Sequence, residues 1–130
     1  MQTGCQIYVK GSAEAVAFYQ RAFGWMIGMH FKGPDGTYAH ASLMSGEREM
    51  LSVAEDCIGT DRIESQDGKW PVMAFNCAGL ESREMVDRAY NVLSECARVA
   101  SNPNGPSPAP WNDYCFSLVD KFGVYWWIAI

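Results

Sequence analysis

The chain has 130 residues, of which 48% are hydrophobic and 19% are charged, and its formal net charge is -5. These values are typical of one globular domain and argue against a disordered chain. Because Lys and Arg are few and scattered, the composition also argues against nucleic acids and anionic membrane surfaces as partners. No segment approaches the roughly 18 consecutive apolar residues of a membrane helix.

The cysteines are widely spaced along the chain: Cys5, Cys57, Cys77, Cys96 and Cys115. They form neither a CxxC pair nor a Cys/His zinc pattern, which favours reduced thiols buried as small hydrophobic groups. The first residues lack the basic start and apolar centre of a signal peptide. We therefore expect a cytoplasmic protein.

The first half of the chain predicts a β-α-β-β-β order. Ser12 is placed to cap a helix whose apolar residues recur at helical spacing as far as Gly24, a residue typical of helix C-termini. A Gly-Pro-Asp-Gly turn is expected at residues 33–36. The strands are expected at residues 5–10, 25–32, 37–44 and 49–54.

The second half repeats this order after a polar connecting loop at residues 55–69. Its helix is predicted at residues 82–96. Residues 101–111 contain four prolines and predict an irregular loop, because proline lacks the N–H that a central strand needs. The strands of this half are expected at residues 70–77, 97–100, 114–119 and 124–130.

Two tandem βαβββ modules of this size would each leave one apolar sheet face uncovered. We therefore expect them to pair in one α+β domain around a curved mixed sheet. The modules are expected at about residues 1–56 and 70–130, joined by a linker at about 57–69. Such a sheet encloses a concave space lined by both halves, and ligand sites favour a space of this kind.

Two adjacent tryptophans, Trp126 and Trp127, lie on the last predicted strand. Neighbouring strand residues point to opposite faces of a sheet. One indole should therefore face a core or pocket, and the other a helix layer or a partner chain.

Three segments resemble the PhnB-like branch of the glyoxalase/bleomycin-resistance/extradiol-dioxygenase superfamily, also called vicinal oxygen chelate. They are GSAEAVAFYQRAFG (11–24), YAHASLMSG (38–46) and VDKFGVYWWI (119–128). The resemblance implies paired βαβββ modules and homodimers. In the metal enzymes of this superfamily, His, Gln or Glu residues of the first and last strands hold a divalent ion that binds vicinal oxygens.

Members of this branch are often labelled as demethylubiquinone methyltransferases. This sequence has no glycine-rich loop followed by an acidic residue, which an S-adenosylmethionine site would suggest. The paired modules are also not the usual methyltransferase fold. We therefore do not expect a methyltransferase.

The resemblance places four metal-ligand positions on this chain. In module one they fall at or near Gln6 and Glu49, which are the two candidate metal ligands. In module two they fall near Val72 or Met73 and on Trp127, and an indole offers no lone pair to a metal. Because a stable site normally needs three or more protein donors, we predict no metal and no other cofactor.

If this interpretation holds, Trp127 forms the pocket wall where a metal ligand would stand, and Trp126 packs toward the helices. The alternative is that both indoles belong to the core. His40 is a candidate general base, with a hydrogen-bonded structural histidine as the alternative. The predicted pocket is lined by polar and aromatic side chains of both modules: Gln6, Tyr8, Tyr38, His40, Trp111 and Trp127.

Three functions remain open from the sequence. The first, which we favour, is a metal-free protein that binds a small, flat or hydrophobic molecule. The second is a metal-dependent lyase, isomerase or dioxygenase acting on vicinal oxygens, which would require Gln6, Glu49 and His40 to converge on one ion. The third is a dimeric structural or interaction module.

Overall fold

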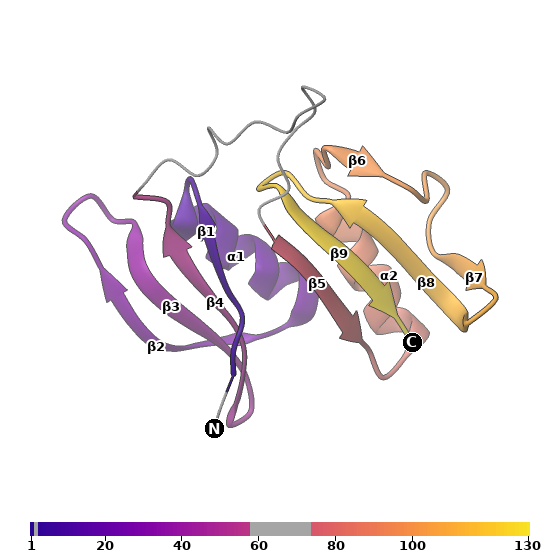
Figure 1. The fold of residues 1–130 in the computed structure, drawn as a ribbon, viewed down its shortest axis with the longest axis horizontal. Helices are drawn as coiled ribbons and strands as arrows, with labels where there is room; N and C mark the ends of the chain where they lie inside the picture. The colour runs from indigo at the N-terminus through magenta and orange to yellow at the C-terminus, as the bar shows by residue number, and fades with distance from the viewer. Residues whose placement is uncertain (2, 58–73) are drawn as a thin grey trace. The chain divides into compact units, whose positions relative to one another are not determined.

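The computed structural model describes residue 1, residues 3–57 and residues 74–130. The chain divides into two compact units, Met1–Pro71 and Val72–Ile130. Each unit has one α-helix and one mixed sheet, which confirms the paired βαβββ order (Figure 1). Among the described residues, the strands of each module are hydrogen-bonded into a mixed sheet. The predicted linker, apart from Cys57, lies outside the described residues.

The first unit is a four-stranded sheet with a helix packed on one face (Figure 1). Its elements are β1 (Gln6–Val9), α1 (Ser12–Phe23), β2 (Met26–Lys32), β3 (Tyr38–Ser45) and β4 (Arg48–Glu55). The strand order is β1-β4-β3-β2, in which β1 runs parallel to β4 and the other neighbours are antiparallel. The hydrophobic periodicity places these elements within one residue of their predicted bounds.

Alternation along the strands gives the first sheet a buried face and an open face. Ile7 on β1 pairs with Val53 on β4, and Leu51 pairs with Leu43 on β3. These side chains are at most 2% exposed and pack under α1, and burial of each stabilises the fold by roughly 1.5–3 kcal/mol. The alternate residues of the same strands lie on the face away from α1, which we call the open face of the first sheet: Gln6, Tyr8, His40, Ser42 and Ser52. On this face Ser42 and Ser52 are themselves buried, at 4% and 7% exposed.

The N-terminus of α1 is capped by a distant side chain, and the prediction that Ser12 caps it is wrong. Gly11 occupies the cap position in a left-handed conformation, with φ of 79°. The carboxylate of Glu55 on β4 accepts hydrogen bonds from the backbone N–H groups of Gly11 and Ser12, at 3.1 and 2.9 Å. The Ser12 hydroxyl instead accepts the backbone N–H of Tyr38, at 2.7 Å. A negative charge suits a helix N-terminus, so Glu55 ties α1 to the sheet.

The second unit repeats the plan, with one helix packed on a mixed sheet (Figure 1). Its elements are β5 (Ala74–Gly79), α2 (Arg83–Leu93), β6 (Val99–Ala100), β7 (Ser107–Ala109), β8 (Asn112–Val119) and β9 (Val124–Ala129). The strands follow the order β5-β9-β8-β6, with β7 also paired to β8, and β5 is parallel to β9. Of the described helices, none is long and apolar enough to cross a membrane.

Several boundaries in the second unit differ from their predictions: β5 ends at Gly79 instead of residue 77, β6 begins at Val99 instead of residue 97, and β8 begins at Asn112 instead of residue 114. The helix predicted to reach Cys96 ends at Leu93, where Ser94 follows as the cap, and the positive φ of Cys96 (53°) is not helical. The irregular loop predicted at residues 101–111 contains β7, which pairs with β8 although it includes Pro108. Proline is tolerated in β7 because this short strand lies at the edge of the sheet.

A buried carboxylate organises the turn between β8 and β9. Asp120 is fully buried, at 0% exposed. Its Oδ1 accepts the backbone N–H groups of Phe122 and Val124 at 2.8 and 3.1 Å. Its Oδ2 accepts the indole N–H of Trp126 at 3.0 Å. With Gly123 at a φ of 85°, the Asp-Lys-Phe-Gly sequence closes the hairpin and anchors Trp126 in the core of this unit.

We expect Asp120→Ala to lower the free energy of unfolding by roughly 2–4 kcal/mol, because buried donors lose their acceptor. Urea unfolding followed by tryptophan fluorescence measures this change. Asp113 lies exposed on β8, so Asp113→Ala serves as the matched control and should cost less than about 0.5 kcal/mol. Equal losses in the two variants would contradict the role given to Asp120.

Candidate functional site

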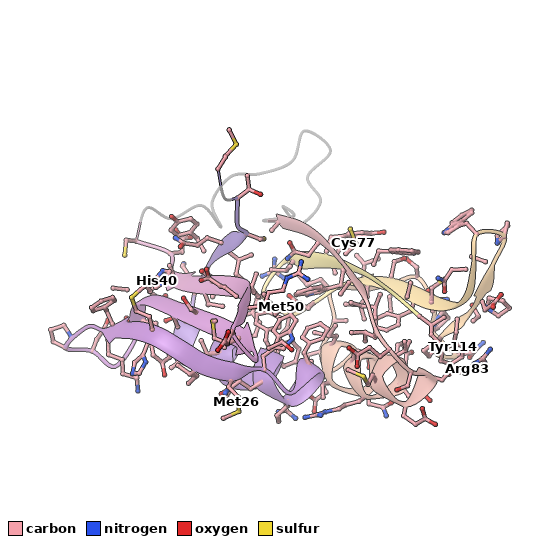
Figure 2. All side chains as sticks on the ribbon, turned by 90° about the horizontal axis from the view of Figure 1, so that it is seen from below. Met26, His40, Met50, Cys77, Arg83 and Tyr114 are labelled. Carbon is pink, nitrogen blue, oxygen red and sulfur yellow. The ribbon has the colours of Figure 1, made fainter. Side chains whose placement is uncertain are left out.

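The adjacent tryptophans of β9 lie on opposite faces of the second sheet, as alternation predicts. Trp126 is 2% exposed and pairs across the hairpin with Leu118, which is also buried. Trp127 is half-buried, pairs with Ser117 and lines a pocket on the other face. Figure 2 shows Cys77, the β5 neighbour of Trp127, on the side of this sheet that faces away from α2.

The pocket that Trp127 lines has a volume of about 260 Å³; we call it the aromatic pocket. Its aromatic walls include Trp111, Tyr125 and Trp127, and Trp111 is 73% exposed on the β7–β8 turn. The other lining residues carry no charge: Asn102, Ser107, Pro108, Ala109, Cys115, Phe116 and Ser117. The pocket therefore offers flat apolar surfaces with a few hydroxyl and amide groups.

Asn102 attaches the proline-rich segment to the second sheet. Its side-chain carbonyl accepts the backbone N–H of Ser117 at 3.2 Å, and its amide donates to the Ser107 hydroxyl at 3.0 Å. Its backbone carbonyl accepts the hydroxyl of Tyr90 at 2.8 Å. Because Ser107 and Ser117 both line the aromatic pocket, these bonds hold two of its walls together.

A chain of hydrogen bonds crosses the open face of the first sheet. His40 Nε2 lies 3.1 Å from Ser42 Oγ, and the Ser42 hydroxyl donates to Glu49 Oε1 at 2.7 Å. The Ser52 hydroxyl donates to the same oxygen at 2.6 Å. The strand register brings these groups together, because Ser42 pairs with Ser52 and Glu49 pairs with Met44, two residues beyond Ser42.

These hydrogen bonds hold the pKa of Glu49 below the ordinary glutamate value of 4.5. The bond from Ser52 makes the largest contribution and the bond from Ser42 the second. The positive charge of protonated His40 lowers the pKa of Glu49 further, by less. Glu49 is therefore ionised at neutral pH, and the open face of the first sheet carries a negative charge at this position.

The residues predicted to line one pocket are distributed over both units. Gln6, Tyr8 and His40 belong to the open face of the first sheet, where the Gln6 amide donates to the Tyr8 hydroxyl at 2.7 Å. Trp111 and Trp127 line the aromatic pocket of the second unit.

Tyr38 does not join the open face of the first sheet. It is 7% exposed, and its ring packs edge-on against His30 and under the ammonium of Lys32. The register of β2 on β3 shifts between Phe31 and Lys32. This irregularity breaks the simple alternation that groups Tyr38 with His40 in the sequence.

The side chains at the expected metal positions do not fit a divalent ion. Gln6, whose amide N–H donates to Tyr8, and Glu49, whose Oε1 accepts two hydroxyl groups, are the two oxygen-bearing candidates, fewer than the three or more donors that a stable site normally needs. Trp127 stands at the last-strand position, and its N–H can only donate. In the described part of the chain, no three or more His, Cys, Asp and Glu side chains form a group that could hold a metal. The position predicted near Val72 or Met73 lies outside the described residues.

Sequence reasoning missed several residues that shape the two sites: Ser42, Ser52, Asn102, Ser117 and Tyr125. Ser42 could have been found, because it lies two residues after His40 on one strand and therefore shares its face. Ser52 and Asn102 carry no such signal, since their partners are set by the pairing of distant segments.

We expect Ser52→Ala to raise the pKa of Glu49 toward 4.5, because the strongest bond to the carboxylate is lost. A carboxyl-carbon NMR titration measures this pKa. Because the pKa of Glu49 is lower in the folded protein than in the unfolded chain, its hydrogen bonds stabilise the folded state above pH 4.5. This stabilisation is lost as the pH falls through the pKa of Glu49 in the folded protein. Ser45→Ala, at the exposed end of β3, is the control; identical titrations in both variants would refute the assignment.

No family model and no curated protein matches the sequence. Solved structures match it over nearly its whole length. Protein PA1353 from Pseudomonas aeruginosa is 19% identical and has a TM-score of 0.75, with 99% of this chain and 96% of that chain covered. The PhnB protein from Bacillus cereus is 20% identical at a TM-score of 0.70, with coverages of 99% and 98%.

A glyoxylase/bleomycin resistance protein/dioxygenase domain from Frankia sp. EAN1pec is 17% identical, with a TM-score of 0.64 and coverages of 100% and 96%. Identities at this level establish a shared fold, while the activity has to be argued from the site. This chain has the paired βαβββ fold of the PhnB protein and glyoxylase/bleomycin resistance protein/dioxygenase domain structures.

Proposed function

We propose that this protein binds a small, flat, uncharged molecule in the aromatic pocket of the second unit, without a divalent metal as cofactor. The observation that carries the proposal is the set of aromatic side chains, Trp111, Tyr125 and Trp127, around one pocket. Indole and phenol rings offer flat faces for stacking at little cost in side-chain entropy.

The size and chemistry of the aromatic pocket narrow the ligand class. A volume of about 260 Å³ lies just below the usual range for drug-sized ligands, roughly 300–1,000 Å³, and suits a molecule of one or two rings. The lining has no charged side chain, so an ionic ligand would lose its hydration without a counter-charge. Ser107 and Ser117 offer hydroxyl groups that can orient a polar substituent.

We expect uncharged one- and two-ring aromatic compounds to shift the indole N–H signal of Trp127 in ¹H–¹⁵N NMR spectra. Trp127→Leu should weaken binding at least about tenfold, or ~1.4 kcal/mol, because the ligand loses its stacking surface. Trp25, which stacks on Phe23 in the core of the first unit, provides the control variant Trp25→Phe. Unchanged affinity in Trp127→Leu would overturn the proposal.

Metal analysis tests the proposal that the protein uses no divalent metal as cofactor. After loading with nickel, zinc or manganese and dialysis, we expect inductively coupled plasma mass spectrometry to find far less than one ion per chain, because the donor set is too small. Stoichiometric retention that disappears in Gln6→Ala and Glu49→Ala would contradict the proposal and point to chemistry on vicinal oxygens.

A further inference from the structure

The hydrogen bonds that link His40 through Ser42 to Glu49 determine which ring nitrogen of His40 carries a hydrogen. A serine hydroxyl has a single hydrogen, and an ionised carboxylate can only accept. Ser42 Oγ lies 2.7 Å from Glu49 Oε1, so its hydrogen must point to that oxygen. The Ser42 oxygen is then left to accept, and His40 Nε2, at 3.1 Å, must be the donor.

The reverse arrangement is physically unfavourable. If Ser42 donated to His40, lone pairs of the Ser42 oxygen and the Glu49 carboxylate would face each other at 2.7 Å. The second hydroxyl, from Ser52, cannot relieve this repulsion, because its hydrogen is already directed to the same carboxylate oxygen. The neutral ring of His40 therefore carries its hydrogen on Nε2 and a lone pair on Nδ1.

His40 lies on the open face of the first sheet, and its partner on the neighbouring strand carries an exposed aromatic side chain. His40 is partly exposed and pairs across β2 and β3 with Phe31, whose side chain is 59% exposed. Figure 2 shows His40 on the first sheet, away from α1. The hydrogen bond from this ring to Ser42 is made by Nε2, which leaves the lone pair of the neutral ring on Nδ1.

We propose that His40 Nδ1 and the ring of Phe31 form a second small-molecule site, on the open face of the first unit, for a flat ligand that carries a weakly acidic O–H or N–H, such as a phenol or an enol. Phe31 supplies the stacking surface, and Nδ1 accepts the acidic hydrogen. Ser42 is a positioning residue, because its bond to Nε2 fixes the ring and its tautomer. Glu49 supplies the negative charge that fixes the direction of these hydrogen bonds.

A proton can move from the ligand to His40 at this site without any further reactant. The O–H bond of the ligand breaks, its electron pair stays on the ligand oxygen, and the proton bonds to Nδ1. The ring becomes an imidazolium that keeps its Nε2–H donated to Ser42. The ionised Glu49, at the far end of the Ser42 hydroxyl, lowers the energy of this positive charge.

The other histidine of the chain provides an internal comparison. His30 Nδ1 lies 3.0 Å from the backbone carbonyl of Gly28. A carbonyl oxygen can only accept, so Nδ1 of His30 must carry the hydrogen. The chain has two histidines, and their neutral rings should therefore be opposite tautomers.

The first test is a long-range ¹H–¹⁵N NMR spectrum of the histidine side chains at a pH where both rings are neutral. We expect one Nε2–H ring and one Nδ1–H ring, and His30→Gln should remove the Nδ1–H pattern. Ser42→Ala should convert the Nε2–H ring to a mixture of tautomers while the His30 signals stay unchanged. An Nδ1–H tautomer for His40 in the wild-type protein would overturn the proposal.

The second test uses 4-nitrophenol, whose phenolate absorbs visible light. Added protein should raise the phenolate fraction and shift the Nδ1 signal of His40, and His40→Ala should weaken this effect at least about tenfold. His30→Gln is the matched control and should keep the full effect. An effect that survives in His40→Ala but disappears in Trp127→Leu would place the phenol in the aromatic pocket and overturn this site while supporting the other. No effect in the wild-type protein would also overturn it.

Discussion

The buried carboxylate of Asp120 is the constraint on which the second unit depends. A carboxylate without water must have its lone pairs satisfied, and here two backbone N–H groups and the indole N–H of Trp126 satisfy them. These bonds fix the hairpin and hold one indole on the buried face. Because side chains alternate along β9, they also fix Trp127 on the opposite face, where it becomes a wall of the aromatic pocket.

Carboxylates in the first unit serve two further purposes. Glu55 accepts the free backbone N–H groups at the start of α1, so a strand residue completes a helix. Glu49 lies at the surface and collects two serine hydroxyls, which gives the hydrogen bonds on the open face a single direction. One charge thereby determines the tautomer of His40, to which it is linked through the Ser42 hydroxyl.

The fold that this chain shares with a glyoxylase/bleomycin resistance protein/dioxygenase structure does not by itself decide its chemistry. Of the positions that the sequence resemblance marks for metal ligands, one holds the indole of Trp127, and two hold the hydrogen-bonded side chains of Gln6 and Glu49. An indole cannot donate a lone pair to a metal, but it binds flat apolar molecules well. The residues present therefore favour recognition by stacking and hydrogen bonding over Lewis-acid chemistry.

The sequence by itself determined the βαβββ order of both modules, apart from β7 and the end of α2, and the opposite faces of Trp126 and Trp127, because these follow from local periodicity. It misplaced the cap of α1, since Glu55 reaches the helix only through the pairing of distant strands. The partners of Glu49 were equally hidden, because Ser42 and Ser52 lie on different strands and meet only in the observed register. Tertiary structure decided these contacts because hydrogen-bond direction depends on which atoms are brought together in space.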